Sequence, residues 1–228
     1  MDAMILAAGR GQRMGELTAN TPKPLLQVAD GSLIEHQLRH LSAAGYLRVV
    51  INTHYLGEQI HRQLGQGRTF GLEIAYSDEF ATVLDTGGGI FQALPLLSDP
   101  FIVVNGDIWT DYPFEQLSIA DTMLAHLVLV ANPGHHPHGD FLLHEGRVQP
   151  LADQGESPGL TFSGIGCYRK ALFRGVDQTV FPLAPLLRQQ AESGRVSAES
   201  YSGQWYDIGT PERLACLQRE FNKELVRE

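Results

Sequence analysis

The sequence predicts an α/β fold with a doubly wound, Rossmann-like, mostly parallel sheet. Over the first 110 residues, short apolar runs alternate with segments of helical periodicity, which is the pattern of βαβ units. The apolar runs are continuous rather than alternating, as expected for strands buried on both faces. A length of 228 residues suits one domain, 1–228, made of two halves, 1–110 and 111–228.

The first half carries the βαβ pattern. Ser32 and Glu35 form a capping box ahead of apolar residues at helical spacing, so we expect a helix that begins there and closes at Gly45. Three consecutive glycines, 87–89, lead into another short helix. The expected strands are 3–6, 49–52, 72–76 and 101–104, and the other expected helices are 56–64 and 90–97.

The second half changes in texture, with loops rich in Pro, Gly and His. Thr210 and Pro211 are suited to the N-cap and first position of a C-terminal helix that runs to about residue 225. We expect this half to form a smaller lobe that extends the same sheet and covers the cleft. The expected strands are 127–130, 161–168, 196–201 and 205–208, with a helix at 183–191.

Composition excludes several classes of partner. The net charge of −9 argues against nucleic acid or an anionic membrane surface, because both demand a basic footprint. No apolar run approaches the length needed to span a bilayer, and the N-terminus lacks the basic segment of a secretory signal. Cys167 and Cys216 have no metal-like spacing, so we expect reduced thiols and a cytoplasmic protein, either monomer or dimer.

The most informative segment is the glycine-rich turn after the first strand. Gly9 and Gly11 offer free backbone N–H groups, and Arg13 and Lys23 add positive charge where an anion would lie. The segment is not a Rossmann fingerprint, because Met14 replaces the third glycine, and it lacks the Gly-Lys-Ser/Thr of a Walker loop. An ordinary tight turn is the alternative, but the two cations favour a phosphate site.

Polar residues follow several expected strands directly. Gly9, Asn52 and the segment 105–107 all stand at carboxyl ends, where ligands bind in such sheets, so they should converge on one cleft. Asp107 and Asp207 each follow a strand and are candidate Mg²⁺ ligands, since this ion takes one or two carboxylates and completes its shell with phosphate and water. Alternatively, either carboxylate caps a turn.

Four ordered motifs together resemble the sugar-1-phosphate nucleotidylyltransferases. They are Leu-Ala-Ala-Gly-x-Gly-x-Arg-Met, Thr-Pro-Lys-Pro-Leu, Asn-Gly-Asp and Trp-x-Asp-Ile-Gly-Thr, and they cover nearly the whole chain. The compact length, Asn-Thr-His-Tyr at 52–55, Thr-Gly-Gly-Gly-Ile at 86–90 and the segment 132–141 are similar to the N-acetylmuramate-1-phosphate uridylyltransferases of bacterial cell-wall recycling. This resemblance implies the GT-A-like nucleotidyltransferase fold, with a nucleotide-binding half at 1–110 and a sugar-binding half with the C-terminal helix at 111–228.

The resemblance also implies roles for individual residues. Arg13, Lys23 and Asp107 would be catalytic, Asp107 and Asp207 would hold Mg²⁺, and Gly88 would let the base lie against the backbone. The nucleotide would be held by Leu6, Gly9, Gly11, Gln12, Arg13, Lys23 and Gly88, and the sugar by Asn105, Asp140, Ser163 and Gly164.

The sequence departs from the thymidylyltransferase pattern at one point. The Glu-Lys-Pro segment whose lysine meets the sugar phosphate is absent, so Arg147, Arg188 or the metal would carry that charge. The histidines at 135, 136 and 138 near Asp140 are expected to form a polar loop over the sugar pocket, with zinc as the alternative. The aromatic residues Trp109, Tyr112 and Trp205 could stack on a ligand or belong to the core.

The predicted reaction joins a nucleoside triphosphate and a sugar 1-phosphate into a nucleotide sugar and pyrophosphate. We expect the substrates to be UTP and N-acetylmuramate 1-phosphate, in peptidoglycan recycling. Mannose-1-phosphate guanylyltransferase and glucose-1-phosphate thymidylyl- or uridylyltransferase are alternatives within the same class. A non-catalytic nucleotide-sensing domain is the alternative from another class, and it would bind nucleotide without Mg²⁺-dependent release of pyrophosphate.

Overall fold

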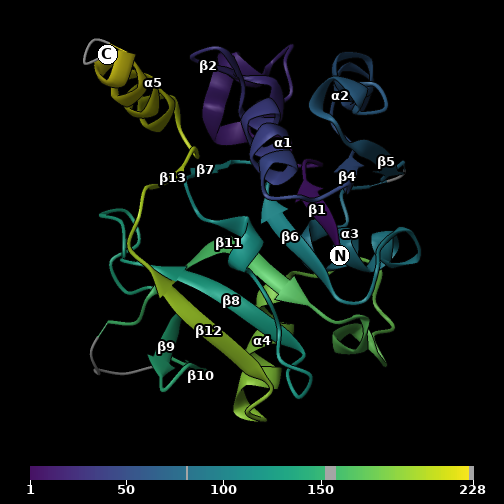
Figure 1. Ribbon diagram of the computed structural model, residues 1–228, viewed down its shortest axis with the longest axis vertical. Coiled ribbons are helices and arrows are strands. Elements are labelled where there is room, and N and C mark those ends of the chain that lie inside the picture. Colours follow the sequence, from purple (N-terminus) through teal and green to yellow (C-terminus); the bar gives the residue numbers. More distant parts are fainter. Residues whose placement is uncertain (81, 152–157, 226–228) are drawn as a thin grey trace.

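A nine-stranded mixed sheet is the centre of the computed structural model, which describes residues 1–80, 82–151 and 158–225, with side chains to residue 221 (Figure 1). The strand order is β5-β4-β1-β6-β11-β8-β12-β10-β9. The predicted α/β class is confirmed. The first half is entirely parallel, whereas the second is mixed: one pair, β8 with β12, is parallel and the other pairs are antiparallel.

The parallel half contains β1 (Asp2–Leu6), β4 (Arg48–Thr53), β5 (Glu73–Asp78) and β6 (Phe101–Asn105). Leu6 stands opposite both Asn52 and Asn105, so the three central strands end at the same level. The polar residues that follow them therefore meet at one edge of the sheet, as predicted from the sequence.

Helices cover both faces of this sheet. On one face, α1 (Leu33–Ala43) and α2 (Gly57–Leu64) bury Ile34, Leu38 and Ile60 against alternate strand residues such as Ile5 and Ile51. On the other, α3 (Asp85–Ala93) and α4 (Leu183–Glu192) pack on the intervening positions. The Ser32 N–H donates to the Glu35 carboxylate (2.7 Å), which confirms the capping interaction at the start of α1.

The second half continues the same sheet. It contains β8 (Ala125–Val130), β9 (Phe141–His144), β10 (Arg147–Pro150), β11 (Thr161–Tyr168) and β12 (Val196–Tyr201). Strand β11 runs antiparallel to β6, with Ile165 opposite Val104, and so joins the two halves through one continuous set of backbone hydrogen bonds. The expected extension of the sheet is confirmed.

A short ribbon connects residues far apart in the chain. Strand β7 (Ile108–Thr110) pairs with β13 (Trp205–Asp207), and α5 (Pro211–Leu225) follows directly (Figure 1). Thr210 Oγ1 accepts from the Arg213 N–H (3.4 Å), as its predicted N-cap role requires. A third apolar cluster, which includes Met14, Leu33 and Leu217, fixes α5 against the first half.

The remaining elements are short. A two-residue pair, β2 (Gln27–Val28) and β3 (Gly31–Ser32), precedes α1. The 3₁₀ segments are η1 (Gln12–Thr18), which is kinked at Gly15, η2 (Lys23–Leu25), η3 (Arg68–Phe70), η4 (Leu94–Leu96), η5 (Phe114–Gln116) and η6 (Lys170–Phe173).

Helix α3 differs from the prediction. It begins at Asp85, so the three glycines lie inside the helix rather than before it. A Cβ at Gly87 would meet the Phe181 ring at 2.4 Å, and one at Gly89 would meet Asn52 Nδ2 at 2.7 Å. These glycines therefore serve close packing, which outweighs their low helix propensity.

Two further observations bear on the chain as a whole. Cys167 on β11 is buried, Cys216 lies on α5, and both are free thiols. Among the described residues, no helix has the length and apolar character needed to cross a membrane.

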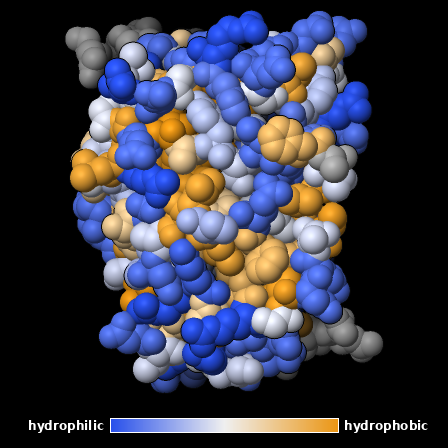
Figure 2. All heavy atoms as spheres, turned by 90° about the vertical axis from the view of Figure 1, so that its right-hand side faces the viewer, coloured by the Kyte–Doolittle hydropathy of each residue, from blue (hydrophilic) through white to orange (hydrophobic). Residues whose placement is uncertain are grey.

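On the face beside α2 and β5, apolar side chains lie among hydrophilic ones across the middle (Figure 2).

Candidate active site

The glycine-rich turn lies at the carboxyl end of β1 and lines a cleft of about 560 Å³. Gly11 has a φ of +66°, and a Cβ there would lie 3.0 Å from Lys23 Cβ. Thr18 Oγ1 donates to the Gly11 carbonyl oxygen (3.0 Å) and holds the turn in place. Gly11 is thus required by both its backbone conformation and its contact with Lys23.

Six predicted nucleotide-binding residues line this cleft together. They bring backbone N–H groups and two cations to one wall, and Arg10, which lies 5.4 Å from the centre of the Tyr55 ring, adds a third cation. The six are Leu6, Gly9, Gly11, Gln12, Arg13 and Lys23.

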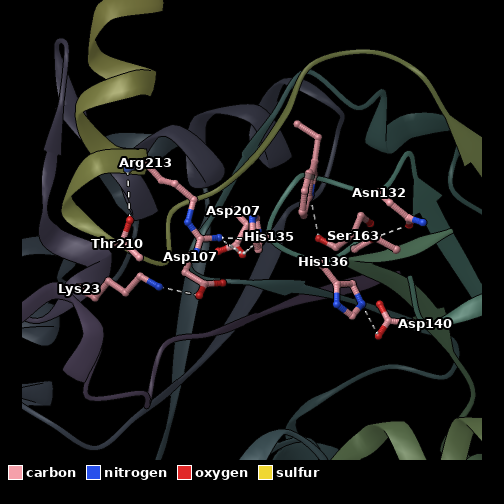
Figure 3. A network of polar contacts seen from close by, with 12 residues as sticks. Lys23, Asp107, Asn132, His135, His136, Asp140, Ser163, Asp207, Thr210 and Arg213 are labelled. Carbon is pink, nitrogen blue, oxygen red and sulfur yellow. Dashed lines mark hydrogen bonds and ion pairs between the residues drawn. The ribbon is translucent and has the colours of Figure 1, made fainter. Parts of the chain in front are cut away.

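Lys23 forms an ion pair with Asp107 across the cleft (Figure 3). The distance from Lys23 Nζ to Asp107 Oδ2 is 2.6 Å, and Lys23 is 7% exposed. Pro22 and Pro24 flank the lysine, and Pro24 stands at the start of the η2 turn. The proline-fixed backbone therefore delivers a nearly buried ammonium group to the carboxylate that follows β6.

Asp207 reaches the same region from the other end of the chain. The Ile208 N–H donates to the Asp107 carbonyl oxygen (2.8 Å), which places the two aspartates on adjacent backbone segments. Asp207 Oδ2 forms an ion pair with Arg213 and lies 3.3 Å from His135 Nε2 (Figure 3). Both aspartates and Arg13 line a second cavity, of about 440 Å³.

The two carboxylates fit a hard divalent cation. Each forms an ion pair with a cationic side chain, Lys23 with Asp107 and Arg213 with Asp207, and these cations offset the repulsion between two acidic groups in one region. Among the described residues, no three His, Cys, Asp or Glu side chains gather as a metal cluster. Such a donor set suits Mg²⁺, whose remaining ligands are phosphate and water, and not a four-ligand structural zinc site.

The histidine loop is divided between the two carboxylates. His135 contacts Asp207, whereas His136 Nε2 lies 3.1 Å from Asp140 Oδ1. Both histidines line the second cavity, so the expected polar loop is present and the zinc alternative finds no support in the described residues.

The predicted sugar residues lie around a third, smaller cavity of about 150 Å³. Asn105, Asp140 and Gly164 line it, and Asp140 Oδ2 accepts from the Phe162 N–H (2.8 Å). Gly164 has a φ of +81°, and a Cβ there would lie 2.6 Å from Asn105 Nδ2. The glycine thus allows the Asn105 amide to lie against β11.

Ser163 differs from this group. It lines the second cavity, but its hydroxyl donates to the Val128 carbonyl oxygen (2.7 Å) and accepts from the Ile165 N–H (3.2 Å). The side chain is therefore engaged within the sheet, where β11 is irregular between Phe162 and Gly166. The Ser163 carbonyl oxygen accepts from Trp205 Nε1 (2.9 Å), which fixes that ring at the cavity.

Gly88 is placed differently from the prediction. It lines none of the three cavities: its N–H donates to the Phe181 carbonyl oxygen (3.1 Å), and a Cβ would meet the Thr179 carbonyl oxygen at 2.2 Å. The close backbone approach that this glycine allows is therefore made by the chain's own loop. Its predicted contact with a base is not supported by this geometry.

The alternatives left open by the sequence are now separated. Arg147 Nη1 donates to the Gly194 carbonyl oxygen (2.6 Å) near the edge of the sheet, whereas Arg188 lines the third cavity. Of the three aromatic residues, Trp205 lines the second cavity, Tyr112 is 2% exposed in the core, and Trp109 packs on Phe221.

Glu79 was not predicted from the sequence. This buried carboxylate accepts from Asn52 Nδ2 (2.7 Å) and from the Leu84 N–H (2.8 Å), while Asn52 Oδ1 accepts from the Ala7 N–H (2.8 Å). Glu79 thus supports the start of the glycine-rich turn through Asn52. It follows β5 directly, so the rule that located Asn52 at the carboxyl end of β4 would also have found it.

The fold and the cleft define a protein of the nucleotide-binding, phosphate-transfer class. The chain belongs to the nucleotidyl transferase family, whose model matches residues 2–141. It is 50% identical over 226 residues to an N-acetylmuramate alpha-1-phosphate uridylyltransferase of Neisseria meningitidis, covering 96% of this chain and 97% of that one. An enzyme of the same name from Caulobacter vibrioides is 33% identical, and the match covers 95% of this chain and 96% of that one. The family resemblance seen in the motifs is confirmed.

Solved structures agree in fold. HddC from Yersinia pseudotuberculosis, complexed with GMP-PN, has a TM-score of 0.81 at 22% identity and covers 96% of this chain and 99% of that one. The inositol-1-phosphate CTP transferase from T. maritima has a TM-score of 0.76 at 19% identity, and the match covers 95% of this chain and 96% of that one. The arrangement of strands and helices is therefore shared by a protein crystallised with GMP-PN and by a transferase named for CTP.

Proposed function

We propose that this protein transfers a uridylyl group from UTP to N-acetylmuramate α-1-phosphate, releasing pyrophosphate, in a Mg²⁺-dependent reaction of peptidoglycan recycling in the cytoplasm. The observation that carries the proposal is the meeting of Lys23, Asp107, Asp207 and Arg13 between the nucleotide cleft and the sugar-side cavities. The choice of substrates is supported by the 50% identity to the Neisseria enzyme over nearly all of both chains. The free thiols suit a reducing compartment.

The triphosphate would lie along the glycine-rich turn. Its phosphates would accept from backbone N–H groups of residues 9–13 and face the cations Arg10, Arg13 and Lys23. Lys23 is nearly buried, so its charge is weakly screened by solvent and its interaction with a phosphate is correspondingly strong.

Asp107 and Asp207 would hold the Mg²⁺ ion. When bound, the ion supplies charge neutralisation and alignment of the two reacting phosphates. The aspartates themselves are fixed by the hydrogen bond between their backbone segments, so they present oxygens from one direction. Arg213 and Lys23 hold the two carboxylates in the site through their ion pairs.

The transfer step requires no general base. An oxygen of the sugar phosphate, already anionic, attacks the α-phosphorus in line; the bond from that phosphorus to the bridging oxygen breaks, and pyrophosphate leaves with the electron pair. Repulsion between the two anions is the main obstacle. Arg13 lines both the nucleotide cleft and the second cavity, so one guanidinium can face both reacting phosphates.

The test is pyrophosphate release measured across four nucleoside triphosphates and several sugar 1-phosphates, with and without Mg²⁺. We expect the fastest release with UTP and N-acetylmuramate 1-phosphate, and none after chelation of the metal. Preference for GTP and mannose 1-phosphate would instead place the chain with the guanylyltransferase of Mycobacterium tuberculosis, to which it is 33% identical. Nucleotide binding with no release would indicate a sensing domain.

A further inference from the structure

The third cavity combines polar and apolar walls. Asn105 and Asp140 stand on one side, where a sugar ring could be hydrogen-bonded. The apolar part of the lining is formed by Leu183 and Leu187 of α4 and by Phe141 and Phe162. The pocket can therefore receive a small apolar group in addition to sugar hydroxyls.

Arg188 contributes a positive charge to the lining of this cavity. It is exposed, and within the described part of the chain its guanidinium forms no hydrogen bond or ion pair. Its backbone is well fixed, because Leu187 is buried and the Leu183 N–H donates to Thr86 Oγ1 on α3 (2.9 Å). Helix α4 thus holds an available cation beside the predicted sugar residues.

The position of Arg188 separates it from the reacting phosphates. Lys23, Asp107 and Asp207 line the first or second cavity and not the third, whereas Asn105 lines all three. A sugar whose phosphate lies at Asp107 would pass over Asn105 and direct a substituent toward α4. An anion that meets Arg188 is therefore carried by the sugar ring and is not the phosphate that reacts.

The carboxylate of Asp140 makes such a cation necessary. It is held by His136 and the Phe162 N–H and lines the same cavity, so it would repel a second carboxylate. A neighbouring guanidinium offsets this repulsion and matches the two oxygens of a carboxylate in a bidentate geometry.

We propose that Arg188 is a specificity-determining residue that pairs with the carboxylate of the lactyl ether of N-acetylmuramate 1-phosphate, while the apolar wall of α4 receives the lactyl methyl group. N-acetylglucosamine 1-phosphate has the same ring, N-acetyl group and phosphate but lacks the lactyl ether. Arg188 thus selects for the acidic sugar. The inference rests on the proposed function.

The test compares the two sugar phosphates at saturating UTP and Mg²⁺. In Arg188→Gln, the KM for N-acetylmuramate 1-phosphate should rise about tenfold to a hundredfold, as expected for loss of a charged hydrogen bond, with a smaller change in kcat. The KM for N-acetylglucosamine 1-phosphate should stay close to that of the unmodified protein. Arg188→Lys should keep part of the preference, and added salt should reduce the preference of the unmodified protein.

Arg174→Gln is the matched control, since Arg174 is also exposed and lines none of the three cavities. Thermal unfolding of each variant checks the fold. If the unmodified protein prefers the acidic sugar and Arg188→Gln keeps that preference, the role of Arg188 is wrong and the proposed function stands. An equal loss for both sugars would also overturn it, by assigning Arg188 to a group that both share. If the unmodified protein does not prefer the acidic sugar, the proposed function and the Arg188 inference both fail.

Discussion

Lys23 and Asp107 are 84 positions apart in the chain, yet Lys23 Nζ lies 2.6 Å from Asp107 Oδ2. The pair joins the segment after the glycine-rich turn to the turn after β6. Each side chain therefore holds the other in position before any substrate arrives. Both line the cleft beside the glycine-rich turn, and Asp107 also lines the second cavity.

Replacing Lys23 should abolish most of the transfer activity. Lys23→Met removes the most buried cation of the cleft, and loss of one such electrostatic contact costs about 10²–10³ in kcat. Pyrophosphate release measures the effect, and thermal unfolding checks the fold. Lys170→Met, in η6 and outside the three cavities, is the matched control. Turnover near that of the control would exclude a catalytic role for Lys23.

Replacing Asp107 or Asp207 should change the Mg²⁺ dependence of the rate, whereas replacing other acidic residues should not. We expect Asp107→Asn and Asp207→Asn each to raise the Mg²⁺ concentration needed for half-maximal rate and to lower kcat about 10²-fold or more. Asp121→Asn, which removes an exposed partner of Arg169, should leave the Mg²⁺ titration unchanged. Binding of Mn²⁺, followed by electron paramagnetic resonance without substrates, gives a second readout. Unaltered ion binding in both variants would contradict the metal assignment.

Gly11 and Gly15 provide a comparison of two glycines with positive φ in the same loop. Gly11 (φ +66°, ψ +37°) has the left-handed helical conformation, in which an alanine costs about 1–2 kcal/mol, whereas Gly15 (φ +58°, ψ −128°) lies outside it, where an alanine is more strained. A Cβ at Gly11 would also press on Lys23, whereas one at Gly15 meets no atom within 4 Å. Gly11→Ala should therefore lower kcat/KM for UTP much more than Gly15→Ala, although Gly15→Ala should lower the melting temperature more. Equal kinetic losses would indicate a general loop effect.

Gln37 is expected to act as a positioning residue for the turn that carries Asp107, a proposed metal ligand. Its Nε2 donates to the carbonyl oxygens of Asn105 (2.8 Å) and Ile108 (2.9 Å), on either side of Asp107. Gln37→Leu should destabilise the protein by about 1–3 kcal/mol, because two acceptors lose a buried donor, and should also raise the Mg²⁺ requirement. Gln66→Leu, at an exposed position, is the control. Loss of stability alone, with an unchanged Mg²⁺ titration, would exclude the positioning role.

The folded protein should lose stability in mildly acidic solution. Burial lowers the pKa of His126 and of His40 below the ordinary value, against the opposing effect of nearby carboxylates such as Glu199. As the pH falls through about 6.5, the unfolded chain binds protons that these folded histidines do not, so the free energy of unfolding decreases. His126→Gln should show a smaller fall in melting temperature between about pH 7.5 and about pH 5.5. The exposed His144→Gln should behave like the unmodified protein.

The fold was predictable from the sequence wherever one local pattern dominated. Continuous apolar runs gave β1, β4 and β6 within one or two residues, because burial on both faces requires apolar side chains at every position. Helix α3 was shifted, since its glycines are explained by packing against Phe181 and Asn52, which no local pattern reveals. The short strands β9 and β10 lack enough residues to show a period.

The site was predictable to the extent that each residue follows a strand or belongs to a motif. Lys23, Asp107 and Asp207 do, and the structure brings them together. Arg213 neither follows a strand nor belongs to one of the motifs. It reaches Asp207 from the first turn of α5. Ser163 was assigned to the sugar through the family resemblance, and a resemblance does not show that its hydroxyl already donates to the Val128 carbonyl oxygen.

The hydrogen bond from the Ile208 N–H to the Asp107 carbonyl oxygen has a consequence for synthesis of the enzyme. The glycine-rich turn, Lys23 and Asp107 leave the ribosome early, whereas Asp207 follows on β13, after every other described strand. Chains fold progressively from the N-terminus during translation. A nascent chain would therefore present its phosphate-binding cations well before it had both carboxylates, and turnover would begin only once this late strand had docked beside β7.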